Sequence, residues 1–345
     1  MKELIRSYLR SNRQWVRIRR LQREGLQAAF IRWRQWIRIL ASTPIRVEPA
    51  QAGSPIEVHL LCCERDYLCA IWALKTFYFF SRTAYPLAIH LQGWCPRRVA
   101  RRFKDHFPGA RVILQSEADA KVNAWLLERN FRRLHSVRQQ QCLMQKLTDF
   151  ILMSDAPRML LLDSDVLFFA HPQRLLEAVD SPPPAATFQR DHDNGYNLTL
   201  EQALDRFSIR LAPALNSGIA VIPRDLVDLS RCEEYLADPE VARPTGLVEQ
   251  TLYALGVCEK VVPQHLPAEA YHISMQSCPD LRSIVARHYT WRSRHLFTSE
   301  GLPALIQAGF LETKPEAADH LYAVQNPNRP PGATLDSISP PGAIR

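Results

Sequence analysis

Residues 158–169 read Arg-Met-Leu-Leu-Leu-Asp-Ser-Asp-Val-Leu-Phe-Phe and form the most apolar strand-like segment of the chain. Its apolar run leads directly into two carboxylates, Asp163 and Asp165. An apolar run without alternation is typical of a strand that is buried on both faces of a parallel sheet. We therefore expect an α/β protein in which this strand ends, with its carboxylates, at the carboxyl-terminal edge of the sheet.

Strand-like and helix-like patterns alternate on both sides of this segment. Strands are predicted over residues 56–62, 87–91, 111–115 and 218–222. Helices are predicted over residues 67–81, around 97–102 and over about 139–154. The polar residues 180–210 are long enough for a functional loop or a small helical insert. This alternation predicts a Rossmann-like, mostly parallel sheet with helices on both faces.

The pair Asp163 and Asp165 has the spacing of a metal site. On a straight strand residues i and i+2 point the same way, so both carboxylates can share one divalent cation. Open α/β sheets bind ligands at the edge where parallel strands end. Oxygen ligands beside a diphosphate favour Mg²⁺ or Mn²⁺. A second pair, Asp191 and Asp193, lies in a polar loop, where it is placed to meet an acceptor or a metal.

One class of enzyme with this local motif is the haloacid-dehalogenase-like phosphatase. Its hhhDxDx(T/V) motif supplies an Asp nucleophile and an acid/base Asp, and residues 160–165 match its hhhDxD part. These enzymes place the motif on the first strand of the core and follow it with a strand that ends in a second acidic pair. Here about 100 residues of α/β pattern precede the motif and no such pair follows. A phosphatase is therefore the alternative hypothesis.

The order of the motifs resembles glycosyltransferase family 8, which includes glycogenin and has the GT-A fold of nucleotide-sugar transferases. The resemblance covers roughly residues 56–300. Asp66 and Tyr67, in the polar corner that begins at Glu64, resemble the opening segment in which an aromatic residue stacks on uracil. Lys146, seventeen residues before Asp163, matches a Lys that contacts the donor.

Three further motifs follow in the order of the family. Asn216–Gly218 resembles an Asn-Ser-Gly that contacts the sugar, and Glu249–Gln250 stands where an Asp-Gln pair lies against it. His288 matches the C-terminal His that completes the metal site. The family's His-x-x-Gly-x-x-Lys-Pro-Trp is altered, because the Gly and the Pro-Trp are absent and Arg294 replaces the Lys. An arginine can still bind a diphosphate bidentately.

The motifs and the resemblance together imply a complete set of site residues. The expected catalytic residues are Asn216, Glu249 and Gln250. The expected donor contacts are Glu64, Tyr67, Lys146, Asp163, Ser164, Asn216, Ser217, Gly218 and Arg294. The expected ligands of Mn²⁺ or Mg²⁺ are Asp163, Asp165 and His288.

The reaction implied by the resemblance is sugar transfer from a nucleoside diphosphate sugar, specifically a UDP-sugar, to an acceptor hydroxyl. The acceptor can be a glycan, a lipid or a protein. The resemblance implies retention at the anomeric carbon, whereas inversion would need a carboxylate base such as Asp191 or Asp193, and both outcomes stay open. A non-catalytic, membrane-associated nucleotide-sugar-binding protein is a third hypothesis.

The positive charge of the chain is concentrated at its beginning. The net charge is +8, but residues 1–46 carry 12 Lys and Arg against 2 Asp and Glu, and the remaining residues sum to −2. An apolar stripe with arginines beside it predicts a basic amphipathic helix. The stripe consists of Leu26, Phe30, Trp33, Ile37 and Leu40. Such a helix can pack on the body, self-associate or lie on an anionic membrane, whereas no basic patch elsewhere favours nucleic acid.

The chain divides into four predicted regions. Residues 1–46 form the basic arm, 47–55 a linker, 56–322 the GT-A domain and 323–345 a Pro-rich tail. None of the eight cysteines forms a C-x-x-C pair, so we expect free thiols in a reducing compartment. The expected location is the cytoplasm, with peripheral attachment to the cytoplasmic face of a membrane.

Overall fold

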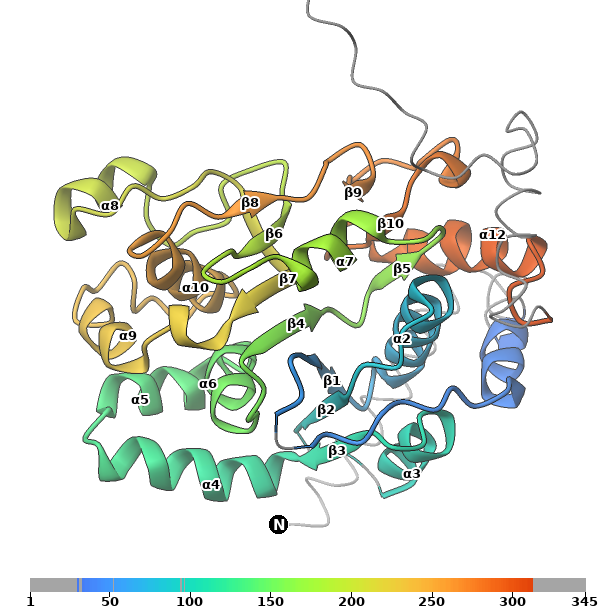
Figure 1. Cartoon of the computed structure of the whole chain (residues 1–345), viewed down its shortest axis with the longest axis horizontal. Helices are drawn as coiled ribbons and strands as arrows, with labels where there is room; N and C mark the ends of the chain where they lie inside the picture. The colour runs from blue at the N-terminus through green and yellow to red at the C-terminus, as the bar shows by residue number, and fades with distance from the viewer. Residues whose placement is uncertain (1–29, 31–32, 52, 94, 96, 313–345) are drawn as a thin grey trace, which may run out of the picture.

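The computed structural model of the chain describes residues 30, 33–51, 53–93, 95 and 97–312 (Figure 1). The Pro-rich tail predicted over 323–345 and most of the basic arm, residues 1–29, lie outside the described residues. The eight cysteines are free thiols, as expected. None of the described helices combines the length and apolarity that crossing a membrane requires.

A seven-stranded sheet forms the centre of the molecule (Figure 1). Its spatial order is β3 (Arg111–Leu114), β2 (Leu87–Gln92), β1 (Glu57–Cys63), β4 (Arg158–Leu162), β7 (Leu215–Pro223), β6 (Thr187–Arg190) and β8 (Gln264–His265). Within the described residues, all strands of this sheet except β7 run in one direction. The prediction of a mostly parallel α/β sheet is confirmed.

Helices cover both faces of the sheet because its strands are apolar on both sides. In β4, Leu160 and Leu162 face one hydrophobic layer, whereas Met159 and Leu161 face the other, and all four are buried. The first layer includes side chains of α2 (Tyr67–Ser81), α3 (Arg97–His106), α7 (Gln173–Asp180) and α12 (Leu302–Gln307). The second includes α4 (Gln115–Glu128), α5 (Arg132–Gln140), α6 (Met144–Leu152), α8 (Leu200–Phe207), α9 (Leu229–Tyr235) and α10 (Val248–Cys258).

The apolar segment that was predicted as one strand is two strands in two sheets. After β4, residues 163–165 turn, and the N–H of Val166 donates to the carbonyl oxygen of Asp163. The chain continues as β5 (Val166–Phe168) in a second sheet with the order β5-β10-β9, where β10 is Ala286–His288 and β9 is Tyr271–Ile273. The expectation of two carboxylates on a straight strand is therefore wrong, because pairing with β10 draws β5 away from the central sheet.

Two other segments differ from the sequence-based expectation. The helix expected over 139–154 is broken between α5 and α6, where Gln141 has an extended backbone and its side-chain oxygen accepts from the N–H of Leu143 at 3.3 Å. The polar stretch 180–210 contains α8, which fits a small helical insert. It also contains β6, which the polar composition did not predict.

The described part of the N-terminal arm packs on the body of the protein. Residues 33–41 are helical, and Ile39 is fully buried in the layer that contains α2. In the predicted linker, Val47 is buried and its N–H donates to the carbonyl oxygen of Pro108 at 3.0 Å. Figure 1 shows this helix beside α2 and α12. The described part of the arm and the first residues of the predicted linker thus contact the body.

Candidate functional site

A cavity of about 580 Å³ lies at the edge where β1, β2 and β4 end. The order of the sheet reverses here, because β1 leads through α2 to β2 on one side and has β4 on the other. A crevice at such a reversal is the usual ligand site of open α/β sheets. Because β7 runs antiparallel to β4, its first residues reach the same edge. Polar residues of the cavity include Asp66, Lys146, Asp163, Ser164, Asp165, Asp191, His192, Asn216, Ser217, Glu249, Gln250, His288 and Arg294.

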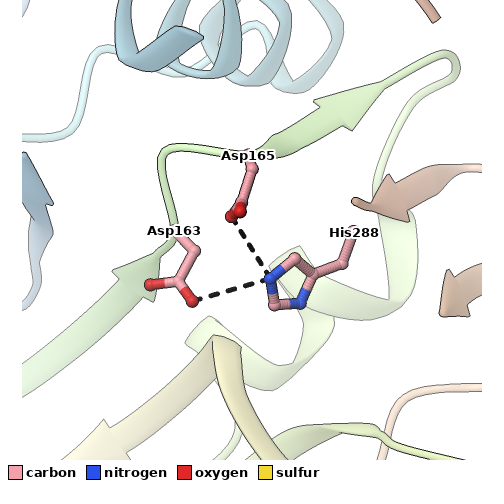
Figure 2. A group of neighbouring side chains, drawn as sticks. All are labelled: Asp163, Asp165 and His288. Carbon is pink, nitrogen blue, oxygen red and sulfur yellow. Dashed lines mark ion pairs between the residues drawn. The ribbon is translucent and has the colours of Figure 1, made fainter. Parts of the chain in front are cut away.

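Two carboxylates and an imidazole converge in this cavity, as Figure 2 shows. His288 Nε2 lies 3.3 Å from Asp165 Oδ1 and 3.6 Å from Asp163 Oδ2. Antiparallel pairing places His288 opposite Val166, the residue after Asp165. The turn after β4 and the β5–β10 pair therefore bring the three side chains together across more than 100 residues of sequence.

The orientation of His288 is determined by its neighbours. Gln189 is fully buried, and its Nε2 donates to the carbonyl oxygen of Tyr271 at 3.2 Å, so its Oε1 faces His288 Nδ1 at 3.2 Å. Nδ1 therefore carries a proton and Nε2 points at the carboxylates. A Cβ atom on Gly218 would lie 2.2 Å from His288 Cε1, so only glycine leaves room for the ring.

The three side chains suit a hard divalent cation. Their ligand atoms all lie within 4.8 Å of one another, and an octahedral site with bonds of about 2.1 Å places neighbouring ligand atoms about 3 Å apart. The imidazole offers Nε2, the ring nitrogen that faces both carboxylates, and the carboxylates remain partly open to the cavity. Burial lowers the pKa of His288, but the hydrogen bond and charge of Asp165 outweigh it and raise that pKa. The donor set thus fits Mn²⁺ or Mg²⁺.

Lys146 on α6 is almost fully buried beside this cluster. Its Nζ lies 2.9 Å from Asp163 Oδ1, 3.8 Å from Glu249 Oε1 and 3.1 Å from Ser217 Oγ. Burial lowers the pKa of Lys146, but the charges of Asp163 and Glu249 outweigh it and raise that pKa. The lysine is a fixed positive charge next to the candidate metal site.

Glu249 on α10 is buried and has an unusual ionisation. Burial raises the pKa of its carboxyl group to about 7, although Lys146 opposes the shift. Oε2 accepts from Ser217 Oγ at 3.2 Å, whereas Oε1 has no hydrogen-bond partner among the described residues. A carboxyl group that is incompletely paired at the wall of a cavity is available to a ligand.

The amides of Asn216 and Gln250 connect β7 to the loop after β6. Asn216 Nδ2 donates to Asp191 Oδ2 at 2.8 Å. Gln250 Oε1 accepts from the N–H of Ser217 at 3.1 Å, and its Nε2 donates to the carbonyl oxygen of Gly195 at 2.8 Å. These bonds fix both amides at the wall of the cavity and bring Asp191 to it.

Arg294 provides another cation of the cavity. Its Nη2 lies 3.0 Å from Asp66 Oδ2, and its Nε lies 3.6 Å from Asp165 Oδ2. Burial disfavours the charge, but Asp165 and Asp66 outweigh it and raise the pKa of Arg294. Despite the altered C-terminal motif, the structure therefore places an arginine against the acidic turn.

Three of the expected donor residues, Glu64, Tyr67 and Gly218, lie outside the cavity lining. Tyr67 packs against the hydrophobic layer that contains α2. Glu64 forms an ion pair with Arg98 at 3.4 Å. Gly218 contributes backbone and space for His288 rather than cavity surface. The remaining expected residues line the cavity.

Several residues of the site gave no local signal in the sequence. Gln189 is one of them, because it lies in a stretch whose polarity suggested a loop. Leu247, Met275 and Trp291 are exposed apolar side chains from three separate segments, and all three line this cavity. Cys63 and Gln92 could have been found, because each stands at the end of a predicted strand at the ligand-binding edge.

Neither protein-family models nor curated protein sequences match the chain. Among solved structures it is similar to mouse xyloside xylosyltransferase 1, at 14% identity and a TM-score of 0.45 over 72% of this chain and 99% of that one. It is similar to the galactosyltransferase LgtC at 15% identity and a TM-score of 0.44, over 77% and 99%. The bifunctional glycosyltransferase WbbM follows at 12% identity and a TM-score of 0.44, over 71% and 47%.

Proposed function

We propose that this chain is a GT-A-type glycosyltransferase that moves a sugar from a UDP-sugar to an acceptor hydroxyl with Mn²⁺ or Mg²⁺. The observation that carries the proposal is the convergence of Asp163, Asp165 and His288 in a cavity that also holds Lys146 and Arg294. A metal site flanked by two cations, at the reversal point of the sheet, suits a nucleoside diphosphate.

The cations of the site would stabilise the leaving diphosphate. When bound, a divalent cation supplies positive charge that offsets the negative charge developing on the leaving group. Lys146 and Arg294 add charge that is already in position, since acidic side chains hold each of them. This arrangement needs little reorganisation during the reaction.

The sugar would lie against the wall formed by β7 and α10. Asn216 and Gln250 are held by hydrogen bonds and can orient hydroxyl groups of the sugar. Glu249, with its pKa of about 7, can accept or donate a hydrogen bond there. The uracil base of the donor would lie towards the ends of β1 and β2. There Leu61, Cys63 and Gln92 line the cavity, whereas Tyr67 does not.

The test combines a binding screen with turnover. Nucleotide sugars with and without Mn²⁺ are screened by thermal shift, and hydrolysis of the stabilising donor is then measured. We expect Asp165→Asn to reduce Mn²⁺-dependent turnover by at least about 100-fold while the protein remains folded. Asp205→Asn is the matched control, because this exposed aspartate lies on α8 outside the cavity.

The same experiment distinguishes the alternative hypothesis. Full Mn²⁺-dependent turnover in Asp165→Asn would contradict the proposal. A phosphatase would instead hydrolyse a generic phosphate ester and form a trappable phosphate adduct on Asp163. Three strands precede β4 along the chain, whereas the phosphatase motif belongs on the first strand of the core.

A further inference from the structure

The helix of residues 33–41 is held to the body by one face. Gln35 is buried and donates from Nε2 to the carbonyl oxygen of Thr298 at 3.2 Å. Ile39 is fully buried, and Arg38 forms an ion pair with Glu312. Lys75 on α2 donates to the carbonyl oxygen of Thr43, just after the helix. These contacts fix the rotation of the helix about its axis.

The opposite face carries large apolar side chains that the body does not cover. Phe30, Trp33 and Ile37 are 56%, 55% and 46% exposed, at the spacing of one helix face. The rings of Phe30 and Trp33 lie 5.7 Å apart. We call Phe30, Trp33 and Ile37 the exposed stripe. Of the stripe predicted from the sequence, Leu40 packs on the body, Leu26 lies outside the described residues, and Phe30, Trp33 and Ile37 are exposed.

The exposed stripe is unusual for the described surface. Ten large hydrophobic side chains are exposed among the described residues, and three of them stand together here. Three others, Leu247, Met275 and Trp291, line the cavity of the candidate functional site. Clustered exposed apolar side chains mark interaction sites more often than scattered ones do.

The charge around the stripe indicates the kind of partner. Arg34 is exposed one residue after Trp33, and residues 1–46 together carry a net charge of +10. A second copy docked stripe to stripe would bring two such segments together, and their repulsion opposes that dimer. An anionic lipid surface offers the opposite charge and an apolar layer at once.

We propose that the exposed stripe is a docking surface for an anionic membrane, on which the helix lies in the plane of the interface. Phe30, Trp33 and Ile37 would enter the boundary between headgroups and acyl chains, while the neighbouring arginines meet the lipid phosphates. Tryptophan favours this boundary because its ring is largely apolar and its N–H is polar. The fixed opposite face would hold the body at the membrane surface.

The test is co-sedimentation of the full-length protein with vesicles. Vesicles of phosphatidylserine and phosphatidylcholine at about 3:7 are compared with pure phosphatidylcholine, at low and high salt. We expect binding to the mixed vesicles that weakens with salt, and at least a tenfold loss for Phe30→Ser/Trp33→Ser/Ile37→Ser. The control is Val262→Ser, since Val262 is 91% exposed after α10, away from the arm helix.

Donor binding by thermal shift is measured on the same variants and should be unchanged, so this proposal and the proposed function fail separately. Absence of binding to the mixed vesicles overturns the docking surface. Equal binding by the triple variant also overturns it. So does concentration-dependent self-association in sedimentation velocity that the triple variant abolishes, because the stripe would then bind a second copy.

Discussion

Two clusters of buried and partly buried polar side chains lie beside the central sheet, and they differ in what surrounds them. The first, which we call the edge cluster, consists of Lys146, Asp163, Asp165, Ser217, Glu249 and His288. The second, which we call the closed cluster, consists of Glu57, His59, His90, Arg111 and Ser154 near the beginnings of β1 and β2. Both hold carboxylates, cations and histidines in a protein interior.

The closed cluster satisfies most of its charge internally. Glu57 accepts from Arg111 Nη2 at 2.8 Å and from Ser154 Oγ at 2.8 Å, and His59 Nδ1 lies 3.2 Å from His90 Nε2. The cavity beside Glu57 and Arg111 measures about 120 Å³, against about 580 Å³ at the edge cluster. We therefore take charge that faces a large cavity, rather than buried charge alone, as the mark of the candidate functional site.

The largest expected effect comes from filling the space beside His288. In Gly218→Ala the new Cβ would lie 2.2 Å from His288 Cε1 and 2.5 Å from Nδ1, so the ring must leave the position in which it faces Asp163 and Asp165. We expect Mn²⁺-dependent donor turnover to fall by at least about 100-fold. The control is Gly256→Ala on α10, where the nearest atom to a Cβ is 3.6 Å away. Wild-type turnover in Gly218→Ala would contradict the metal role of His288.

A smaller effect is expected when the ring is left in place but loses its orienting hydrogen bond. Gln189→Leu removes the acceptor for His288 Nδ1 and should lower Mn²⁺ affinity by about 10- to 100-fold. Calorimetric titration of Mn²⁺ measures it. Gln264→Leu on the neighbouring β8 is the control, because Gln264 is exposed. Equal Mn²⁺ affinity of Gln189→Leu and wild type would show that Gln189 does not orient the ligand.

The closed cluster should affect stability rather than activity. Glu57→Gln breaks a bidentate pair with Arg111, which is partly exposed, and should lower the free energy of unfolding by about 1–3 kcal/mol. Donor turnover per folded molecule should not change. Urea unfolding and turnover are compared with Glu177→Gln, which breaks an exposed pair with Arg174 and should cost under about 1 kcal/mol. Loss of turnover in Glu57→Gln would remove the distinction between the clusters.

The last predictions concern opposite pH dependences of stability in the metal-free protein. Burial, with a smaller contribution from Arg111, lowers the pKa of His90 to about 3. Between about pH 6.5 and 3, His90 is therefore protonated in the unfolded chain but neutral in the folded protein. Stability should therefore fall as the pH drops from about 6.5 towards 3, and His90→Gln should weaken this fall. Unfolding free energies across this range measure it, and an unchanged profile in His90→Gln would contradict it.

Glu249 should give the opposite pH dependence of stability. Its raised pKa of about 7 means that the fold keeps a proton that the unfolded chain loses near pH 4.5. Stability from this group is full below pH 4.5 and is lost as the pH rises to about 7, by roughly 3 kcal/mol. Glu249→Gln should flatten the profile between pH 4.5 and 7. A slope equal to that of wild type would show that the carboxyl is already ionised in the fold.

Local pattern predicted most of the first half of the sheet. The strands at 57–63 and 87–92 and the helix at 67–81 agree with the sequence to within about one residue, because apolar runs and polar corners mark their ends. The division of residues 158–168 into two strands could not be predicted. The apolar run is interrupted only by the acidic turn, and pairing with a strand more than 100 residues away separates its halves.

The candidate site was also predictable only where a local pattern in the sequence marks a residue. Asp163 and Asp165 stand out because two charges follow a buried strand. Lys146, Glu249 and His288 were placed only through the order of motifs in a resembling family, since none has a local signal. Gln189 was not predicted, because its role depends on two contacts between distant parts of the sequence. These are the pairing of β6 with β7 and the hydrogen bond from Gln189 to Tyr271 in β9.

The central claim is that Asp163, Asp165 and His288 together bind a metal that holds a nucleoside diphosphate. Calorimetric titration of UDP, with Mn²⁺ and then with a chelator, tests it most directly in wild type and in Asp165→Asn and His288→Ala. We predict that Mn²⁺ tightens UDP binding by at least about tenfold in wild type and has no effect in either variant. Equal UDP affinity with Mn²⁺ and with chelator in the wild-type protein would contradict the account.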